Sequence, residues 1–163
     1  MLECATMTLT CEIAPPELAL KKDAELHRPI QVLLVEDDEE TAELVQMGLM
    51  DDSDAPFRSE WSHNLVEAMT RLAHPGIDVI VLDLGLPESS GCLSYRAIDA
   101  AAKHRLPIVI FTSDDRSASR NVTLRLGASD YLLKHENSTS QLRRALRGAL
   151  LHGRPERGGG AEC

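Results

Sequence analysis

The sequence predicts an α/β protein in which a parallel sheet of five strands carries helices on both faces. Short apolar runs of five or six residues alternate along the chain with longer segments whose apolar residues recur at helical spacing. The connections between these segments are short. Alternation of this kind is typical of parallel sheets built from strand–helix–strand units.

Five segments read as strands. IQVLLV is a continuous aliphatic run, as expected of a strand buried on both faces, and DVIVLD and PIVIF are similar. FRSEWS alternates apolar and polar residues, which is typical of a half-exposed strand, and DYLLK is a short apolar run. The predicted strands span residues 30–35, 57–62, 78–83, 107–111 and 130–134.

Five helical segments follow these strands. The segment 64–76 is stopped by its Pro-Gly pair, and Gly127 ends the fourth segment. The last segment places leucine and alanine on one face and arginine elsewhere around it. The predicted helices are 39–50, 64–76 up to its Pro-Gly stop, 94–104, 116–126 and 140–153.

The composition divides the chain into one folded domain with two tails. Residues 1–29 contain a Pro-Pro pair and read as a flexible N-terminal arm, with a short helix at 17–26. Residues 30–152 hold all the predicted strands and long helices. Residues 153–163, rich in glycine and charge, read as a disordered C-terminal tail.

Charge and apolar patterning exclude several classes of function. Residues 30–140 carry nineteen acidic and nine basic residues, so the core should repel phosphate backbones and not bind nucleic acid directly. No apolar run approaches the length of about 18 residues that a membrane span needs. The start lacks a basic signal-peptide region, and the four cysteines, without metal-ligand spacing, read as reduced thiols. A cytoplasmic location is expected.

A carboxylate stands at the end of the apolar run DVIVLD. Burying an isolated carboxylate is expensive, so Asp83 needs compensating partners. The carboxyl ends of parallel strands meet at one edge of a sheet, where ligands bind. The polar residues expected at this edge are Glu36, Asp37, Asp38, Asp83, Thr112, Ser113 and Lys134.

These residues together indicate a metal site more strongly than any one of them does alone. Carboxylates held close together raise one another's pKa unless a cation lies among them. Ligands that are all oxygen favour a hard ion such as Mg²⁺. Taken singly, each residue has an ordinary explanation: Asp38 suits a helix N-cap, and Lys134 suits the surface, as most lysines do.

Four motifs carry a resemblance to a known family. VLLVEDD, DLGLPESSG, IVIFTS and GASDYLLK, in this order, resemble the response-regulator receiver domain of two-component signalling over roughly residues 30–152. The resemblance implies a flavodoxin-like, doubly wound (βα)5 receiver fold. It assigns the phosphoacceptor to Asp83, the phosphate-binding lysine to Lys134, the switch residues to Thr112 and Tyr131, and the Mg²⁺ ligands to Glu36, Asp37, Asp83 and the backbone carbonyl of Gly85.

The resemblance also implies a function. A phosphohistidine of a histidine kinase or phosphotransfer protein would donate its phosphoryl group to Asp83. The surface formed by residues 116–126, 130–134 and 140–153 would then change and regulate a protein partner, a second copy in a phosphorylation-dependent homodimer included. Such a domain is not an enzyme in the usual sense, since it catalyses only its own phosphorylation and dephosphorylation. No output motif follows residue 152, so a stand-alone receiver domain without an attached output domain is expected.

One residue departs from the family pattern, and three alternatives stay open. His135 follows Lys134 where the family usually has proline; a cis bond there would cost about 2.5–4 kcal/mol, so a trans bond is expected. The chain could be an interaction module that acts without phosphorylation, or the receiver portion of a larger sensor protein. A metal-dependent hydrolase would need a second carboxylate or an acid near Asp83, where the loop offers Gly85.

Overall fold

The computed structural model describes residues 28–50, 56–89, 91–153 and 155. The predicted arm up to residue 27, its short helix at 17–26, and the predicted tail apart from residues 153 and 155 lie outside these described residues. The strands and helices of the described part run from Ile30 to His152.

A parallel sheet of five strands forms the centre of the described chain, in the order β2-β1-β3-β4-β5, so the predicted fold class is confirmed. The register sets Val35 beside Leu82 and Thr112 beside Leu133, which brings the carboxyl ends of the strands to one edge. The strands are β1 (Ile30–Val35), β2 (Phe57–Ser62), β3 (Val79–Leu82), β4 (Ile108–Thr112) and β5 (Asp130–Leu133).

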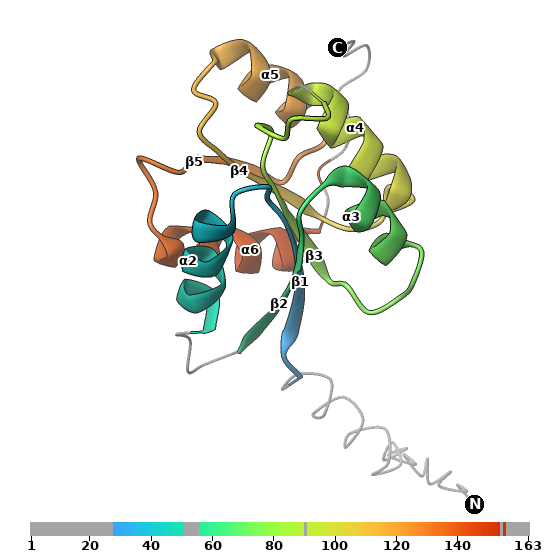
Figure 1. The fold of residues 1–163 in the computed structure, drawn as a ribbon, viewed down its shortest axis with the longest axis vertical. Coiled ribbons are helices and arrows are strands. Elements are labelled where there is room, and N and C mark those ends of the chain that lie inside the picture. The colour runs from blue at the N-terminus through green and yellow to red at the C-terminus, as the bar shows by residue number, and fades with distance from the viewer. Residues whose placement is uncertain (1–27, 51–55, 90, 154, 156–163) are drawn as a thin grey trace, which may run out of the picture.

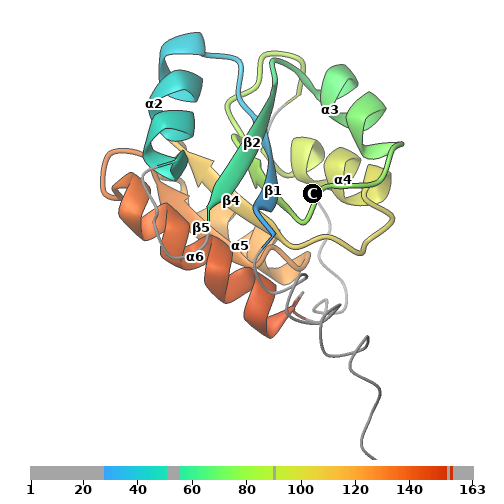
Figure 2. The same ribbon diagram turned by 90° about the horizontal axis from the view of Figure 1, so that it is seen from below.

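Helices cover both faces of this sheet (Figure 1 and Figure 2). The helices are α2 (Glu39–Met50), α3 (Leu65–Leu72), α4 (Cys92–Ala101), α5 (Ser117–Arg125) and α6 (Thr139–His152). Helices α2 and α6 bury Val45 and Leu142 against one face, while α3 and α4 bury Ala68 and Ile98 against the other, which α5 also covers. Among the described helices, none has the length and hydropathy to cross a membrane.

Helix α4 differs most from its predicted bounds of 94–104. It begins at Cys92, directly after Gly91, whose φ of 54° suits glycine. It ends at Ala101 because Lys103 and His104 adopt φ values of 52° and 58°, a left-handed conformation that a helix cannot continue through.

Candidate functional site

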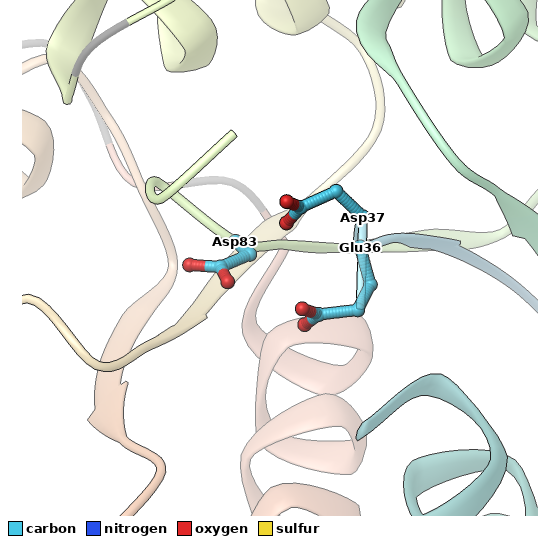
Figure 3. Close-up of side chains that lie close together, drawn as sticks. All are labelled: Glu36, Asp37 and Asp83. Atoms are coloured by element: carbon cyan, nitrogen blue, oxygen red, sulfur yellow. The ribbon is translucent and has the colours of Figure 1, made fainter. Parts of the chain in front are cut away.

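The carboxyl ends of four strands bring the predicted polar residues together. Glu36 follows β1, Asp83 follows β3, Thr112 ends β4 and Lys134 follows β5. The carboxylates of Glu36, Asp37 and Asp83 lie close together (Figure 3), and each offers an oxygen within 4.8 Å of the others. The sequence therefore placed these acids at one edge correctly.

Lys134 lies between two of the carboxylates. Its Nζ is 2.6 Å from Glu36 Oε2 and 2.6 Å from Asp83 Oδ2, and 17% of its side chain is exposed. Burial alone would lower the pKa of Lys134, but the hydrogen bonds to Asp83 and Glu36 outweigh it and the pKa is raised. The ammonium group therefore stays charged and neutralises part of the acidic site. The sequence indicated a shared site, but not the direct contact between Lys134 and Glu36.

Asp83 is buried, with 6% of its surface exposed, and both of its carboxylate oxygens accept hydrogen bonds. Asp83 Oδ1 accepts from Thr112 Oγ1 at 2.6 Å and from the backbone N–H of Gly85 at 2.9 Å, while Oδ2 accepts from Lys134. A Cβ atom added to Gly85 would lie 3.5 Å from each carboxylate oxygen, so glycine leaves the approach to Asp83 open. The role predicted for the Gly85 carbonyl stays a prediction.

Glu36 is the most deeply buried acid of the site, at 1% exposure. Burial raises the pKa of Glu36 to about 7, and the hydrogen bond from Lys134 opposes this rise. The Glu36 backbone carbonyl accepts a hydrogen bond from Trp61 Nε1 at 2.8 Å, which places the single tryptophan of the chain beside the site.

Asp37 and Asp38, although adjacent in sequence, do different things. Asp37 is exposed and belongs to the acidic cluster. Asp38 Oδ1 accepts a hydrogen bond from the backbone N–H of Thr41 at 2.8 Å. Hydrogen bonding to the Thr41 side chain and, to a lesser extent, to its backbone lowers the pKa of Asp38. The prediction that Asp38 caps the helix, here α2, is confirmed.

The donor set suits a divalent cation. Three carboxylates, when ionised, leave an excess of two negative charges over the single ammonium of Lys134. A hard ion that takes oxygen ligands would offset this excess, and Glu36, Asp37 and Asp83 could hold it.

The two predicted switch residues are both buried, Thr112 at 0% and Tyr131 at 2% exposure. Both contact Asp114, whose backbone N–H donates to Thr112 Oγ1 at 3.2 Å and whose carbonyl accepts from the Tyr131 hydroxyl at 2.7 Å. Burial raises the pKa of Tyr131 to about 12. The sequence interpretation missed Asp114; an acid two residues after Thr112 and two before Arg116 was the available signal.

The loop after β5 contains no cis bond. All peptide bonds among the described residues are trans, so the trans bond expected between Lys134 and His135 is confirmed. Lys134 nevertheless reaches both carboxylates, so proline is not needed to place its ammonium group.

This fold and site define a signalling domain of a known class. The sequence model of the response regulator receiver domain matches residues 32–147, and the chain belongs to this family. The resemblance seen in the motifs is thereby confirmed.

Several characterised proteins share part of this sequence. The chain is 34% identical over 105 residues to the swarming motility regulation protein RssB of Serratia marcescens, covering 64% of this chain and 46% of that protein. It is 32% identical over 140 residues to the transcriptional regulatory protein TrcR of Mycobacterium tuberculosis, covering 83% and 52%. The chain thus spans about half the length of the curated relatives it matches.

Solved structures agree on the fold. A response regulator receiver domain protein from Clostridium thermocellum matches with a TM-score of 0.66 at 20% identity, over 76% of this chain and 95% of that one. The phosphorylated cyanobacterial phytochrome response regulator RcpA matches with a TM-score of 0.61 at 26% identity, over 78% and 99%.

Proposed function

We propose that the chain is a two-component receiver that accepts a phosphoryl group on Asp83 from a phosphohistidine of a histidine kinase or phosphotransfer protein. The observation that carries this proposal is the position of Asp83, a buried carboxylate held by Lys134, Thr112 and Gly85 and facing two further acids. A carboxylate in such a setting can act as a nucleophile.

In the proposed reaction an oxygen of Asp83 forms a bond to phosphorus while the phosphorus–nitrogen bond of the donor breaks and the imidazole leaves. Phosphoryl transfer needs mainly positioning and neutralisation of charge. Lys134, 2.6 Å from Asp83, would pair with one phosphoryl oxygen, and the Thr112 hydroxyl, also 2.6 Å from Asp83, would donate to another. Gly85 leaves room for the incoming group.

Mg²⁺ is the proposed cofactor, held by Asp37, Asp83, the Gly85 carbonyl and, directly or through water, Glu36. When bound, it would neutralise negative charge on the transferring phosphoryl group. The excess of negative charge in the acidic cluster supports this choice, as does its set of oxygen ligands.

The proposed output is a change at the surface formed by α5, β5 and α6. Thr112 and Tyr131 both contact the loop between β4 and α5. Movement of one side chain would therefore shift this loop and change the position of the other. The surface would bind a protein partner, a second copy of the chain included, and not DNA, since residues 30–140 are strongly acidic. The proposal keeps the cytoplasmic location that the sequence indicates.

Intact-mass measurement with a small phosphodonor tests the proposal. The wild-type chain should gain one phosphoryl group in the presence of Mg²⁺, and Asp83→Asn should gain none because the nucleophilic oxygen is replaced by an amide. Labelling that persists in Asp83→Asn, or that proceeds without a divalent ion, would contradict the assignment.

Asp37→Asn and Asp38→Asn form a matched pair for the metal. The residues are adjacent and both exposed, but only Asp37 belongs to the acidic cluster, whereas Asp38 caps α2. The first variant should weaken Mg²⁺ binding clearly more than the second. Equal losses would show that the metal lies elsewhere.

A further inference from the structure

Asp114 connects the two switch residues through its backbone. Its N–H donates to Thr112 Oγ1 at 3.2 Å, and its carbonyl accepts from the Tyr131 hydroxyl at 2.7 Å. Thr112 in turn donates to Asp83 at 2.6 Å. A rotation of the Asp114 backbone would therefore disturb the hydroxyl beside the acceptor carboxylate and the buried phenol together.

Arg116 holds Asp114 in this orientation. Its Nε and Nη2 donate to the two carboxylate oxygens of Asp114 at 2.8 and 2.7 Å, and its backbone N–H donates to Oδ1 at 3.0 Å. These bonds keep the pKa of Asp114 well below its usual range. A two-pronged arginine–carboxylate contact fixes direction as well as distance, and the two residues are close in sequence, so little entropy opposes it.

Arg120, which lies in α5 one helical turn after Arg116, contacts Tyr131, the second switch residue that Asp114 connects. Its guanidinium carbon lies 5.7 Å from the centre of the Tyr131 ring, within the range of a cation–π contact. The ring is thus held by its hydroxyl on Asp114 and covered by a cation on α5. Arg120 lies in α5, part of the surface that the proposed function assigns to output, and Arg116 is the residue directly before this helix.

We propose that Arg116 and Arg120 are positioning residues of the switch: Arg116 orients Asp114 so that Thr112 faces Asp83 and Tyr131 stays buried, and Arg120 holds the Tyr131 ring over the same loop. The inference rests on the proposed function only for its consequence in signalling. The contacts themselves are a property of the folded chain and can be measured without a phosphodonor.

Fluorine NMR of the full chain labelled with 3-fluorotyrosine tests the inference. The chain has two tyrosines, so Tyr95, which is fully buried, serves as the internal reference for Tyr131. The probe is a soluble gadolinium chelate, which broadens the resonance of an exposed ring. Arg116→Gln and Arg120→Gln should each increase the broadening of Tyr131 by about two- to fivefold, as expected for the loss of one partly exposed contact, and leave Tyr95 unchanged.

Two further variants make the result specific. Arg125→Gln removes a positive charge from the other end of α5 and should leave both resonances unchanged. Arg116→Lys keeps the charge without the two-pronged geometry and should restore the burial of Tyr131 only in part. Full restoration by lysine would overturn the geometric role of Arg116. If Arg116→Gln disturbed Tyr95 as well, Arg120→Gln and Arg116→Lys would decide the outcome.

An unchanged Tyr131 resonance in both glutamine variants would overturn the inference. It would leave the proposed function untouched, because phosphorylation of Asp83 is measured separately by mass. Conversely, a chain that fails to accept a phosphoryl group would still report the effect of the arginines on Tyr131.

Discussion

The Nζ atom of Lys134 lies 2.6 Å from the carboxylate of Asp83, so the site already contains one full counter-charge for its central acid. The same ammonium contacts Glu36 at an equal distance. Loss of Lys134 would therefore leave two buried carboxylates facing each other.

Lys134→Ala should lower the free energy of unfolding by about 1–3 kcal/mol, because buried charged groups would lose their partner. Mg²⁺ should stabilise this variant more than it stabilises the wild type, since the ion then supplies the missing positive charge. Urea unfolding with and without Mg²⁺ measures both effects. In the double variant Lys134→Ala/Glu36→Gln the loss should be smaller, and a loss of equal size would argue against repulsion between the acids.

Mg²⁺ affinity should rise with pH between 6 and 8. The pKa of Glu36 is raised to about 7, so below this pH Glu36 holds a proton and the cluster lacks one negative charge, whereas above it the charge is present. The expected increase is about tenfold, from the ionised fraction of one carboxyl group at the two pH values. Calorimetry checks the affinity, and Glu36→Gln should flatten the dependence.

Trp61 offers a second measurement of the same dependence, because it contacts the Glu36 backbone. The centre of the His63 ring lies 3.8 Å from the centre of the Trp61 ring, so this neighbour would also affect the fluorescence. The fluorescence titration therefore belongs in a His63→Gln background. An affinity that stays constant over this pH range would show that Glu36 does not contribute its charge to the ion.

Thr112→Val should slow phosphorylation of Asp83 by about tenfold or more, because valine keeps the shape of threonine but removes the hydroxyl that faces the acceptor. Thr112→Ser keeps the hydroxyl and should retain most of the rate. Phosphorylation is followed by intact mass at fixed donor concentration. Equal phosphorylation rates in the two variants would show that the Thr112 hydroxyl has no role in the reaction.

Tyr131→Ala should uncouple phosphorylation from output. The ring is buried against the loop after β4 and lies outside the acidic cluster, so Asp83 should still accept a phosphoryl group. A working switch implies a coupling of about 1–3 kcal/mol between phosphorylation and partner binding, and the variant should lose most of it. The measurement is a pull-down from native lysate that compares the proteins bound to the chain with and without beryllofluoride. A mobility-shift assay on random DNA is run alongside it.

Two results would contradict the proposed output. The first is a set of partners that responds neither to beryllofluoride nor to Tyr131→Ala. The second is tight binding of random DNA by residues 30–152 at physiological salt, which their acidic composition disfavours.

Much of the site could be predicted because the fold itself brings strand ends together. Once residues 30–35 and 78–83 read as strands of one parallel sheet, the acids at their carboxyl ends are expected at the same edge, and Glu36, Asp37 and Asp83 do lie together there. The end of α4 could not be predicted in this way. The stretch AAAKH favours a helix locally, whereas the structure turns at Lys103 and His104 with left-handed backbone.

The contacts of Arg116 with Asp114 could not be predicted from the sequence either. They depend on the path of a short loop and on side-chain rotamers, neither of which has a periodic signal. The same holds for the pairing of Lys134 with Glu36. Each residue was predicted to serve an absent group, a phosphoryl or a metal, and only the packed structure shows that they contact each other.

The distance along the chain between Glu36 and Lys134, 98 positions, has a consequence for the order of folding. Strand β1 pairs with β2 and β3, while the lysine arrives only when β5 joins the far edge of the sheet. A folding intermediate that lacks β5 would hold its acids at the strand ends without their ammonium group. Long-range contacts form slowly, so β5 should join the sheet late, while repulsion among these acids opposes its docking. Because cations reduce this repulsion, refolding of this chain should be faster in Mg²⁺ than in a monovalent salt of equal ionic strength.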